Sequence, residues 1–355
     1  MRGARCCSGL DHSLSTAARR HTHERRRANL APRRSPSSRC FLRFAPIRDF
    51  VDWPGGKAFA FTVVDDTDGA TLADVPAVYA LLDELGFRTT KTIWTLGGAN
   101  DDGLTCDDPR YGAWAEGLQA RGFEIGLHNV ASRTSPRGRT IEGIERFREI
   151  FGTYPSVHVN HHICRENIYW GSARLSGRHR AIYDLLNRRA RGTASFEGHV
   201  EASSLFWGDV CRSKVKYVRN FVHADINTRR YCPEMPYHDP ERPFVKYWFA
   251  STEGPNVDKF VRKLSDANLD RLAAERGACI MYTHFASGFA PHGELDPRFV
   301  RVMRRLSSLN GWFVPATTLL DHLLAADGHH EITDAERSRL ERRWLVHKLR
   351  VGGTS

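Results

Sequence analysis

The sequence predicts an α/β fold in which parallel strands alternate with helices, at a size that suits one (β/α) barrel with extensions. Short apolar runs that end in Gly or polar turns alternate with segments whose apolar residues recur at helical spacing. The chain has 355 residues, of which 41% are hydrophobic and 26% charged, so it can bury a large core. Strand–helix alternation at this pitch favours parallel βα units.

The first third of the folded region shows the alternation most clearly. Residues 58–64 form an apolar run with a β-branched end and a polar turn after it, which predicts a buried strand. Residues 71–85 then carry apolar side chains at helical spacing and end at Gly86, which predicts a helix. The same signals predict strands at 89–96, 123–127 and 156–161, and helices at 111–121 and 141–151, the second capped by Thr140.

The pattern returns after an irregular middle region, residues 163–243, in which only one helix, at 180–190, is predicted. The later segments predict strands at 244–250, 278–283 and 312–314, and helices at 257–264, 297–306, 317–325 and 334–349. We therefore expect three parts: an Arg-rich extension over 1–45, a barrel over 46–326 and a helical extension over 327–355.

The positive charge is concentrated in the N-terminal tail. Residues 1–50 carry 12 Arg and three acidic residues, a net charge of +9, so only +2 of the total +11 falls on the other 305 residues. This distribution argues against a nucleic-acid-binding domain. The composition of residues 1–45 predicts a disordered extension that folding and activity do not need, with an organelle transit peptide or a polyanion-binding arm as alternatives.

Cysteine spacing and hydropathy limit the location. Five of the eight cysteines lie outside the tail, far apart and without a C-x-x-C pair, which predicts free thiols in a reducing compartment. The sequence has no run of 18 apolar residues and no visible secretory signal. We therefore expect a cytoplasmic protein without a membrane span; its oligomeric state is left open.

Acidic and imidazole side chains follow four of the predicted strands. These strand ends carry Asp65-Asp66, His128-Asn129, Asn160-His161-His162 and Thr283-His284. The carboxyl ends of parallel strands meet on one face, where functional groups collect. A carboxylate with two imidazoles binds a divalent transition metal, with zinc as the expected ion, and a second carboxylate beside it can accept a proton from water.

The segments around these residues resemble the polysaccharide deacetylases, the NodB-homology group of carbohydrate esterases. The run 118–128, which leads into His128, is the most specific similarity. Weaker similarities cover 58–69, 152–159, 280–284 and 312–323. The resemblance implies a distorted (β/α) barrel of about seven parallel strands and a metal-dependent hydrolase that acts on amide, but not peptide, bonds.

The resemblance also implies residue roles. Asp65 is expected to be the general base, Asp66 and His128 metal ligands, and His284 the general acid. Ser132 stands where the family's second motif has its last His, so the third ligand is expected from His161 or His162, and the sequence leaves open which. Asp68 is an additional carboxylate that we expect to cap the following helix.

The expected substrate is an acetylated glycan or glycan precursor, and neither nucleic acid nor membrane is expected as a partner. Aromatic rings beside polar groups suit the faces of sugars, so we expect four residues to contact the substrate: Asn160, Arg165, Trp170 and Trp248. Two alternatives remain: a catalytically inactive glycan-binding relative of the same fold, and a polyanion-binding protein that acts through its basic tail.

Overall fold

The computed structural model describes residues 51–98, 101–187 and 195–351. The described residues belong to one compact unit. The predicted Arg-rich extension over 1–45 and the last three residues of the predicted helix 180–190 lie outside the described residues.

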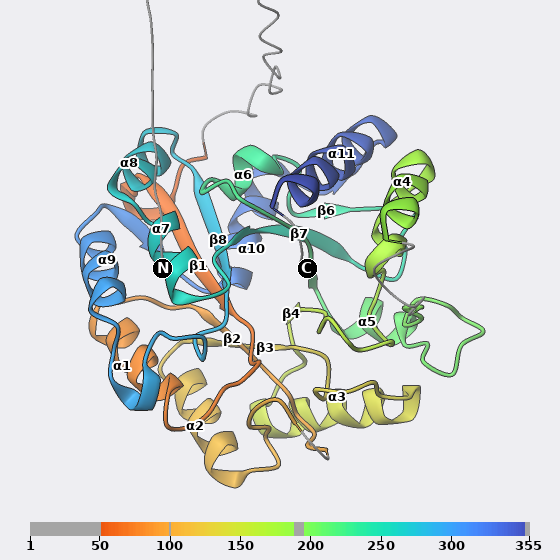
Figure 1. The fold of residues 1–355 in the computed structure, drawn as a ribbon, viewed down its shortest axis with the longest axis horizontal. Coiled ribbons are helices and arrows are strands. Elements are labelled where there is room, and N and C mark those ends of the chain that lie inside the picture. The colour runs from red at the N-terminus through yellow and green to blue at the C-terminus, as the bar shows by residue number, and fades with distance from the viewer. Residues whose placement is uncertain (1–50, 99–100, 188–194, 352–355) are drawn as a thin grey trace, which may run out of the picture. The chain divides into compact units, whose positions relative to one another are not determined.

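Seven parallel strands close into a barrel (Figure 1). Around the ring, β8 is followed by β1, β2, β3, β4, β5 and β7, and β7 pairs with β8 to complete the closure. The bounds are β1 Phe59–Asp65, β2 Thr90–Ile93, β3 Glu124–Leu127, β4 Val157–His158, β5 Tyr217–His223, β7 Tyr247–Glu253 and β8 Ala278–Thr283. The predicted (β/α) barrel is therefore confirmed by the strand order of this chain.

Three short strands extend this sheet outside the ring. β9 (Gly311–Phe313) runs parallel to the first half of β1. β6 (Tyr237–His238) pairs antiparallel with β7, and β10 (His330–Glu331) then pairs with β6. The predicted strand 312–314 corresponds to β9, whereas β6 and β10 were not predicted.

Helices surround the barrel wall (Figure 1). Their bounds are α1 Val75–Glu84, α2 Pro109–Ala120, α3 Arg137–Phe151, α4 Gly177–Asn187, α5 Gly208–Lys214, α6 Thr228–Tyr231, α7 Val257–Lys263, α8 Asp266–Ala274, α9 Pro297–Ser307, α10 Ala316–Asp327 and α11 Asp334–Val351. Three 3-10 turns cover Pro54–Gly56, Gly171–Arg174 and Pro291–Gly293. No helix in the described part of the chain combines the length and apolar character that a bilayer crossing needs.

The helix ends show which local signals decide the boundaries. The last helical residue of α3 is Phe151, and Gly152 follows it in a left-handed conformation with φ of 74°. This is the end that a glycine at this position predicts. The prediction that Thr140 caps this helix is wrong, because the helix begins one turn earlier, after Pro136, and Thr140 is buried inside it. The proline favours this earlier start because its fixed φ suits a helix entrance.

The middle region contains a barrel strand that the sequence did not predict. β5 is fully buried, yet Arg219 and Asn220 interrupt its apolar run. Both side chains are tolerated in the interior because they have polar partners: Arg219 pairs with Asp66, and Asn220 donates to the Tyr237 hydroxyl at 3.2 Å. The prediction of a strand at 244–250 was three residues early, since β7 begins at Tyr247.

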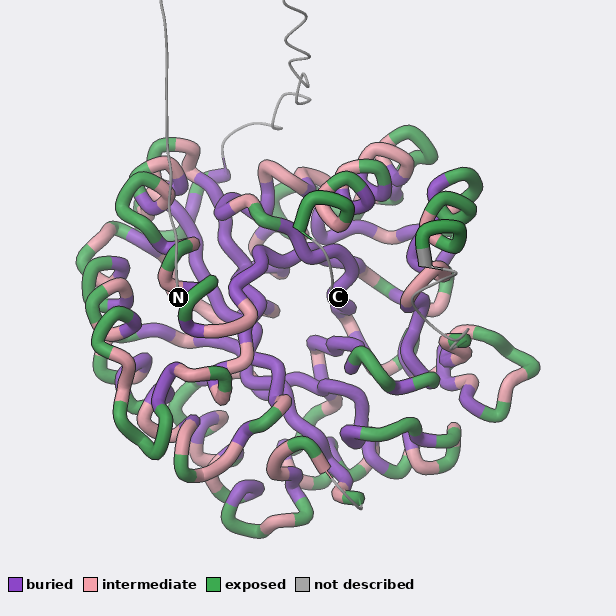
Figure 2. The backbone as a smooth tube through the Cα atoms, viewed as in Figure 1, coloured by how far each residue is buried: buried purple, intermediate pink, exposed green. Residues whose placement is uncertain are grey.

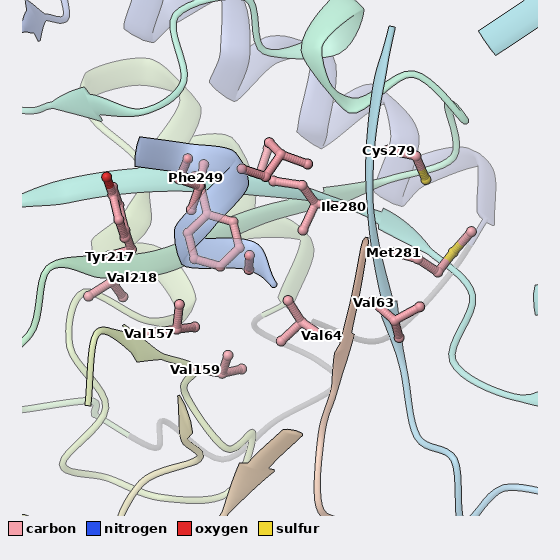
Figure 3. Packing of buried hydrophobic residues seen from close by; sticks show 14 of the residues in the cluster. Val63, Val64, Val157, Val159, Tyr217, Val218, Phe249, Cys279, Ile280 and Met281 are labelled. Carbon is pink, nitrogen blue, oxygen red and sulfur yellow. The ribbon is translucent and has the colours of Figure 1, made fainter. Parts of the chain in front are cut away.

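The apolar core is built from the barrel strands and from the helix faces that pack on them, and the strands are coloured almost entirely as buried in Figure 2. Figure 3 shows part of this cluster, in which Val64, Val159, Phe249 and Ile280 are fully buried. The five described cysteines are also buried and unpaired, as predicted. A closed wall packed in this way gives the loops at the strand ends a rigid base.

Candidate metal and hydrolase site

Three imidazoles converge on Asp68 where barrel strands end. The Nε2 atoms of His128 and His161 each lie 2.9 Å from an Asp68 carboxylate oxygen, and His284 Nε2 lies 3.4 Å from Oδ2. His128 and His284 directly follow β3 and β8, His161 comes three residues after β4, and Asp68 lies in the turn after β1. Asp68 is 24% exposed, so this face of the cluster is open to solvent.

Backbone carbonyls fix two of the rings. His128 Nδ1 lies 3.2 Å from the carbonyl oxygen of Val159, and His284 Nδ1 lies 3.1 Å from that of Pro255. A carbonyl oxygen only accepts, so both Nδ1 atoms carry the hydrogen. This leaves the His128 Nε2 lone pair directed toward Asp68, which is the arrangement of a histidine that binds a metal.

A buried amide joins the loops that carry His128 and His161. Asn129, with φ of 52°, accepts from the His161 backbone N–H at 2.9 Å and donates to Glu166 Oε1 at 3.0 Å. Cys164 Sγ lies 3.5 Å from His161 Nδ1 and occupies the side of the ring away from Asp68. These contacts hold the two imidazoles in fixed relative positions.

The atoms that face one another in this cluster fit a metal ion. Asp68 Oδ2, His128 Nε2 and His161 Nε2 are buried, and none of them has a hydrogen bond of acceptable geometry within the described residues. Ligands at 2.0–2.2 Å from a shared ion lie roughly 3–3.5 Å apart. The contacts of His128 Nε2 with Asp68 Oδ2 and of His161 Nε2 with Asp68 Oδ1 are both 2.9 Å long. Carboxylate and imidazole donors suit a divalent transition metal.

Asp66 faces the barrel interior and pairs with Arg219. The two guanidinium nitrogens contact the two carboxylate oxygens at 2.9 and 2.5 Å, and both side chains are 3% exposed. The guanidinium also lies 4.5 Å from the centre of the Tyr282 ring. Ligand-type atoms of Asp66, Asp68 and His128 lie within 4.8 Å of one another, so Asp66 borders the cluster.

Asp65 points to the opposite face of β1. Its Oδ1 accepts from the Phe285 backbone N–H at 2.7 Å, while Oδ2 lies 3.0 Å from the Tyr79 hydroxyl and 2.9 Å from Lys91 Nζ. Burial raises the pKa of Asp65, although the neighbouring Lys91 opposes this shift. These contacts connect the loop after His284 to β1. The assignment of Asp65 as general base stays a prediction.

The site separates charge between Asp68 and His284. Burial opposes ionisation of Asp68, but the neighbouring imidazoles, His128 foremost, lower the pKa of Asp68 strongly. Burial also disfavours the charged form of His284, but its hydrogen bond to Asp68 and the charge of Asp66 raise the pKa of His284. The cluster therefore holds an anionic carboxylate next to an imidazole that retains its proton.

The two histidines left open as ligands lie in different surroundings. His161 is 1% exposed and faces Asp68, whereas His162 is exposed, with its ring 4.9 Å from that of His161. Donor atoms of Asp68, His161 and His162 still lie within 4.8 Å of one another. Burial lowers the pKa of His162. Ser132 donates to Asp101 at 2.6 Å, outside this group.

Two of the predicted substrate-binding residues make contacts within the protein. Asn160 is buried, and its amide exchanges hydrogen bonds with the backbone of Ile168 at 2.9 and 3.0 Å. Trp170 is 7% exposed, and the Arg174 guanidinium lies 3.5 Å from its ring centre. Their roles in substrate binding stay predictions.

The other two predicted substrate residues differ in exposure. Trp248 is 1% exposed and packs against Tyr169, with ring centres 6.1 Å apart. Arg165 is exposed and forms an ion pair with Glu197 at 2.6 Å. Arg165 is therefore the one member of the predicted set that reaches solvent, and its contact with a substrate also stays a prediction.

Three residues of the site were not predicted for it: Asp68, Arg219 and Trp94. Trp94 is fully buried and packs against the rings of His128 and His161, with centres 6.1 and 5.4 Å away. The period-2 alternation of an extended chain was the available signal for Asp68, because it places Asp66 and Asp68 on the face of Val64. No sequence pattern pointed to Arg219, because the strand that carries it, β5, was not predicted.

No family model matches the sequence, and no curated protein matches it. Solved structures do. A Mycobacterium smegmatis protein described as a polysaccharide deacetylase is 14% identical, with 80% of this chain and 96% of that chain covered and a TM-score of 0.49. A Pseudomonas aeruginosa PAO1 protein described in the same way is 13% identical, with 77% of this chain and 93% of that chain covered and a TM-score of 0.46. Puue allantoinase is 14% identical, with 78% of this chain and 97% of that chain covered and a TM-score of 0.44.

These identities concern the fold, and the barrel assignment rests on the strand order of this chain. Solved structures described as polysaccharide deacetylases, the family that the sequence resembles, are thus among those similar to this chain.

Proposed function

We propose that this chain is a metal-dependent hydrolase that removes acetyl groups from the nitrogen of a glycan or glycan precursor. The observation that carries the proposal is the convergence of Asp68, His128 and His161, whose facing atoms are buried without hydrogen bonds within the described residues. Asp66 and His284 border the same cluster and can handle protons.

We assign the metal to Asp68, His128 and His161, with zinc as the expected ion. This set replaces Asp66 by Asp68 in the ligand set expected from the sequence, because Arg219 already engages both oxygens of Asp66. It also favours His161 over His162, since only His161 is buried beside Asp68.

A divalent ion at this site would polarise the acetyl carbonyl and make a water molecule easier to deprotonate. Asp66, held in one orientation by Arg219, accepts a proton from the attacking water. His284 Nε2 donates a proton to the departing nitrogen, while the Pro255 carbonyl holds its other nitrogen. A C–O bond forms and the C–N bond breaks, so the products are acetate and a free amine.

Metal content and acetate release test the proposal together. The purified protein should contain one divalent ion per chain by elemental analysis, and it should release acetate from N-acetylated oligosaccharides. Asp68→Asn should lose both metal and turnover, whereas Asp66→Asn should keep the metal and lose turnover by about 10²–10⁴-fold. Asp52→Asn, which changes an exposed carboxylate, serves as the control and should retain both.

Two results would change the conclusion. If Asp66→Asn strips the metal as fully as Asp68→Asn does, the original ligand assignment of Asp66 is correct. If metal-loaded wild-type protein releases no acetate from N-acetyl or O-acetyl glycans, the chain is a binding relative and not an enzyme.

A further inference from the structure

A cavity lies at the end of the barrel strands opposite the metal cluster. It measures about 440 Å³ and is lined by Arg212, His238, Lys246, Tyr247 and His329. Tyr247 is the first residue of β7, whereas the opposite end of that strand pairs with β8 just before His284. This cavity is therefore separate from the metal cluster, and its volume lies within the roughly 300–1,000 Å³ of small-molecule sites.

The lining brings cationic and hydrogen-bonding groups together from separate parts of the chain. Arg212 lies in α5, Lys246 precedes β7, and His329 precedes β10. Within the described ranges, no carboxylate pairs with the Arg212 guanidinium or the Lys246 ammonium. Both side chains are exposed, so an anionic ligand can reach them from solvent.

The carboxylate of Asp321, which lies on α10 beside Lys216 and Tyr217, is already engaged. The Asp321 carboxylate accepts from Lys216 Nζ and from the Tyr217 hydroxyl, both at 2.6 Å. Tyr217 packs beside Tyr247, with ring centres 5.9 Å apart. Asp321 is therefore engaged outside the cavity lining, while the exposed Glu331 lies opposite His238 in the β10–β6 pair.

The imidazoles and the phenol add polar atoms and a flat surface. His238 Nδ1 lies 3.2 Å from two backbone carbonyl oxygens and so donates to them, which makes Nε2 of the neutral ring an acceptor. His329 Nδ1 contacts the Tyr247 hydroxyl at 3.3 Å. The Arg212 guanidinium and the Lys246 ammonium are the donors that suit a tetrahedral oxyanion, and the tyrosine ring suits a sugar or another ring.

We propose that this cavity binds a small molecule through its phosphate or sulfate group. The site is independent of the proposed hydrolase function, because it lies at the opposite strand ends and shares no residue with the metal cluster. It gives this chain a second ligand, which is either a regulator or an anionic part of a larger substrate.

Calorimetric titration of the full chain tests the site, with glucose 6-phosphate, glucose 6-sulfate and unmodified glucose as probes at constant ionic strength. One or both anionic sugars should bind saturably, and the preferred one identifies phosphate or sulfate as the recognised group. Glucose should not bind. The double variant Arg212→Gln with Lys246→Gln should bind the anionic sugar about tenfold or more weakly, because each substitution removes a charged hydrogen bond.

The matched control removes two positive charges elsewhere. Arg178→Gln with Arg301→Gln alters exposed arginines on α4 and α9 and should leave affinity unchanged. Equal weakening by both double variants would show a non-specific charge effect and overturn the proposal, as would the absence of saturable binding to wild-type protein. Binding that disappears in Asp68→Asn would place the anion at the metal cluster and also refute it.

Discussion

Arg219→Met should destabilise the protein more than almost any other single change at the site. Arg219 and Asp66 form a bidentate pair at 2.9 and 2.5 Å with 3% exposure on each side. At an effective dielectric constant of 20, charges at this separation attract by about 6 kcal/mol, part of which offsets desolvation. Removing one partner leaves Asp66 charged and buried, so unfolding free energy should fall by about 3–5 kcal/mol.

Urea unfolding of a double-mutant cycle measures this effect. Asp66→Asn combined with Arg219→Met removes both charges, so the double variant should be more stable than the sum of the single effects predicts, by on the order of 2–3 kcal/mol. Arg301→Met is the control and should stay within about 0.5 kcal/mol of wild type, because Arg301 is exposed. Simple additivity, or a loss below about 1 kcal/mol in Arg219→Met, would refute the reasoning.

Asn129→Ala should weaken metal affinity by about 10–100-fold, measured by competition with a chelating dye, because the link between the His128 and His161 loops is lost. His284→Ala should keep the metal and lower acetate release by about 10²–10⁴-fold, and a loss of metal would show that it is a ligand. Truncation of residues 1–45 should leave the melting temperature within a few degrees of that of the full chain and acetate release unchanged. A larger drop in melting temperature would contradict the prediction that folding does not need this segment. The hydrogen bond from His347 lowers the pKa of Glu253 from its ordinary 4.5, so the stability this pair adds is present above that pH and is lost as the pH falls below it; Glu253→Gln should remove this part of the pH dependence of urea unfolding.

The fold was predictable because most barrel strands are apolar runs between clear helix signals. β1 and β8 are buried along their whole length and appear in the sequence as uninterrupted apolar or β-branched segments. β5 was missed because a buried strand with Arg219 at its centre has the composition of a surface segment. The partner that makes this arginine tolerable, Asp66, is 153 residues away, and no local pattern shows such a pairing.

The positions of the candidate site were predictable, but the division of roles within it was less so. His128, His161 and His284 all lie at strand ends and meet in one cluster, as strand-end chemistry predicted. Which of the neighbouring carboxylates can reach the cluster depends on the face of the chain from which each side chain projects. That choice is set by contacts with distant elements such as α1, β2 and β5.

Asp65, Asp66 and Asp68 lie within four positions of the chain, but their carboxylates contact different partners. Asp65 turns toward Lys91 and Tyr79 outside the barrel, and the buried charge there has protein partners. Asp66 and Asp68 turn inward, but Arg219 reaches only the first, while the second meets the imidazoles. Our proposal assigns the proton to Asp66, which Arg219 holds in one orientation, and the metal to Asp68, which faces the imidazole nitrogens. In this proposal the order Asp-Asp-Thr-Asp corresponds to an anchoring residue, a base and a ligand.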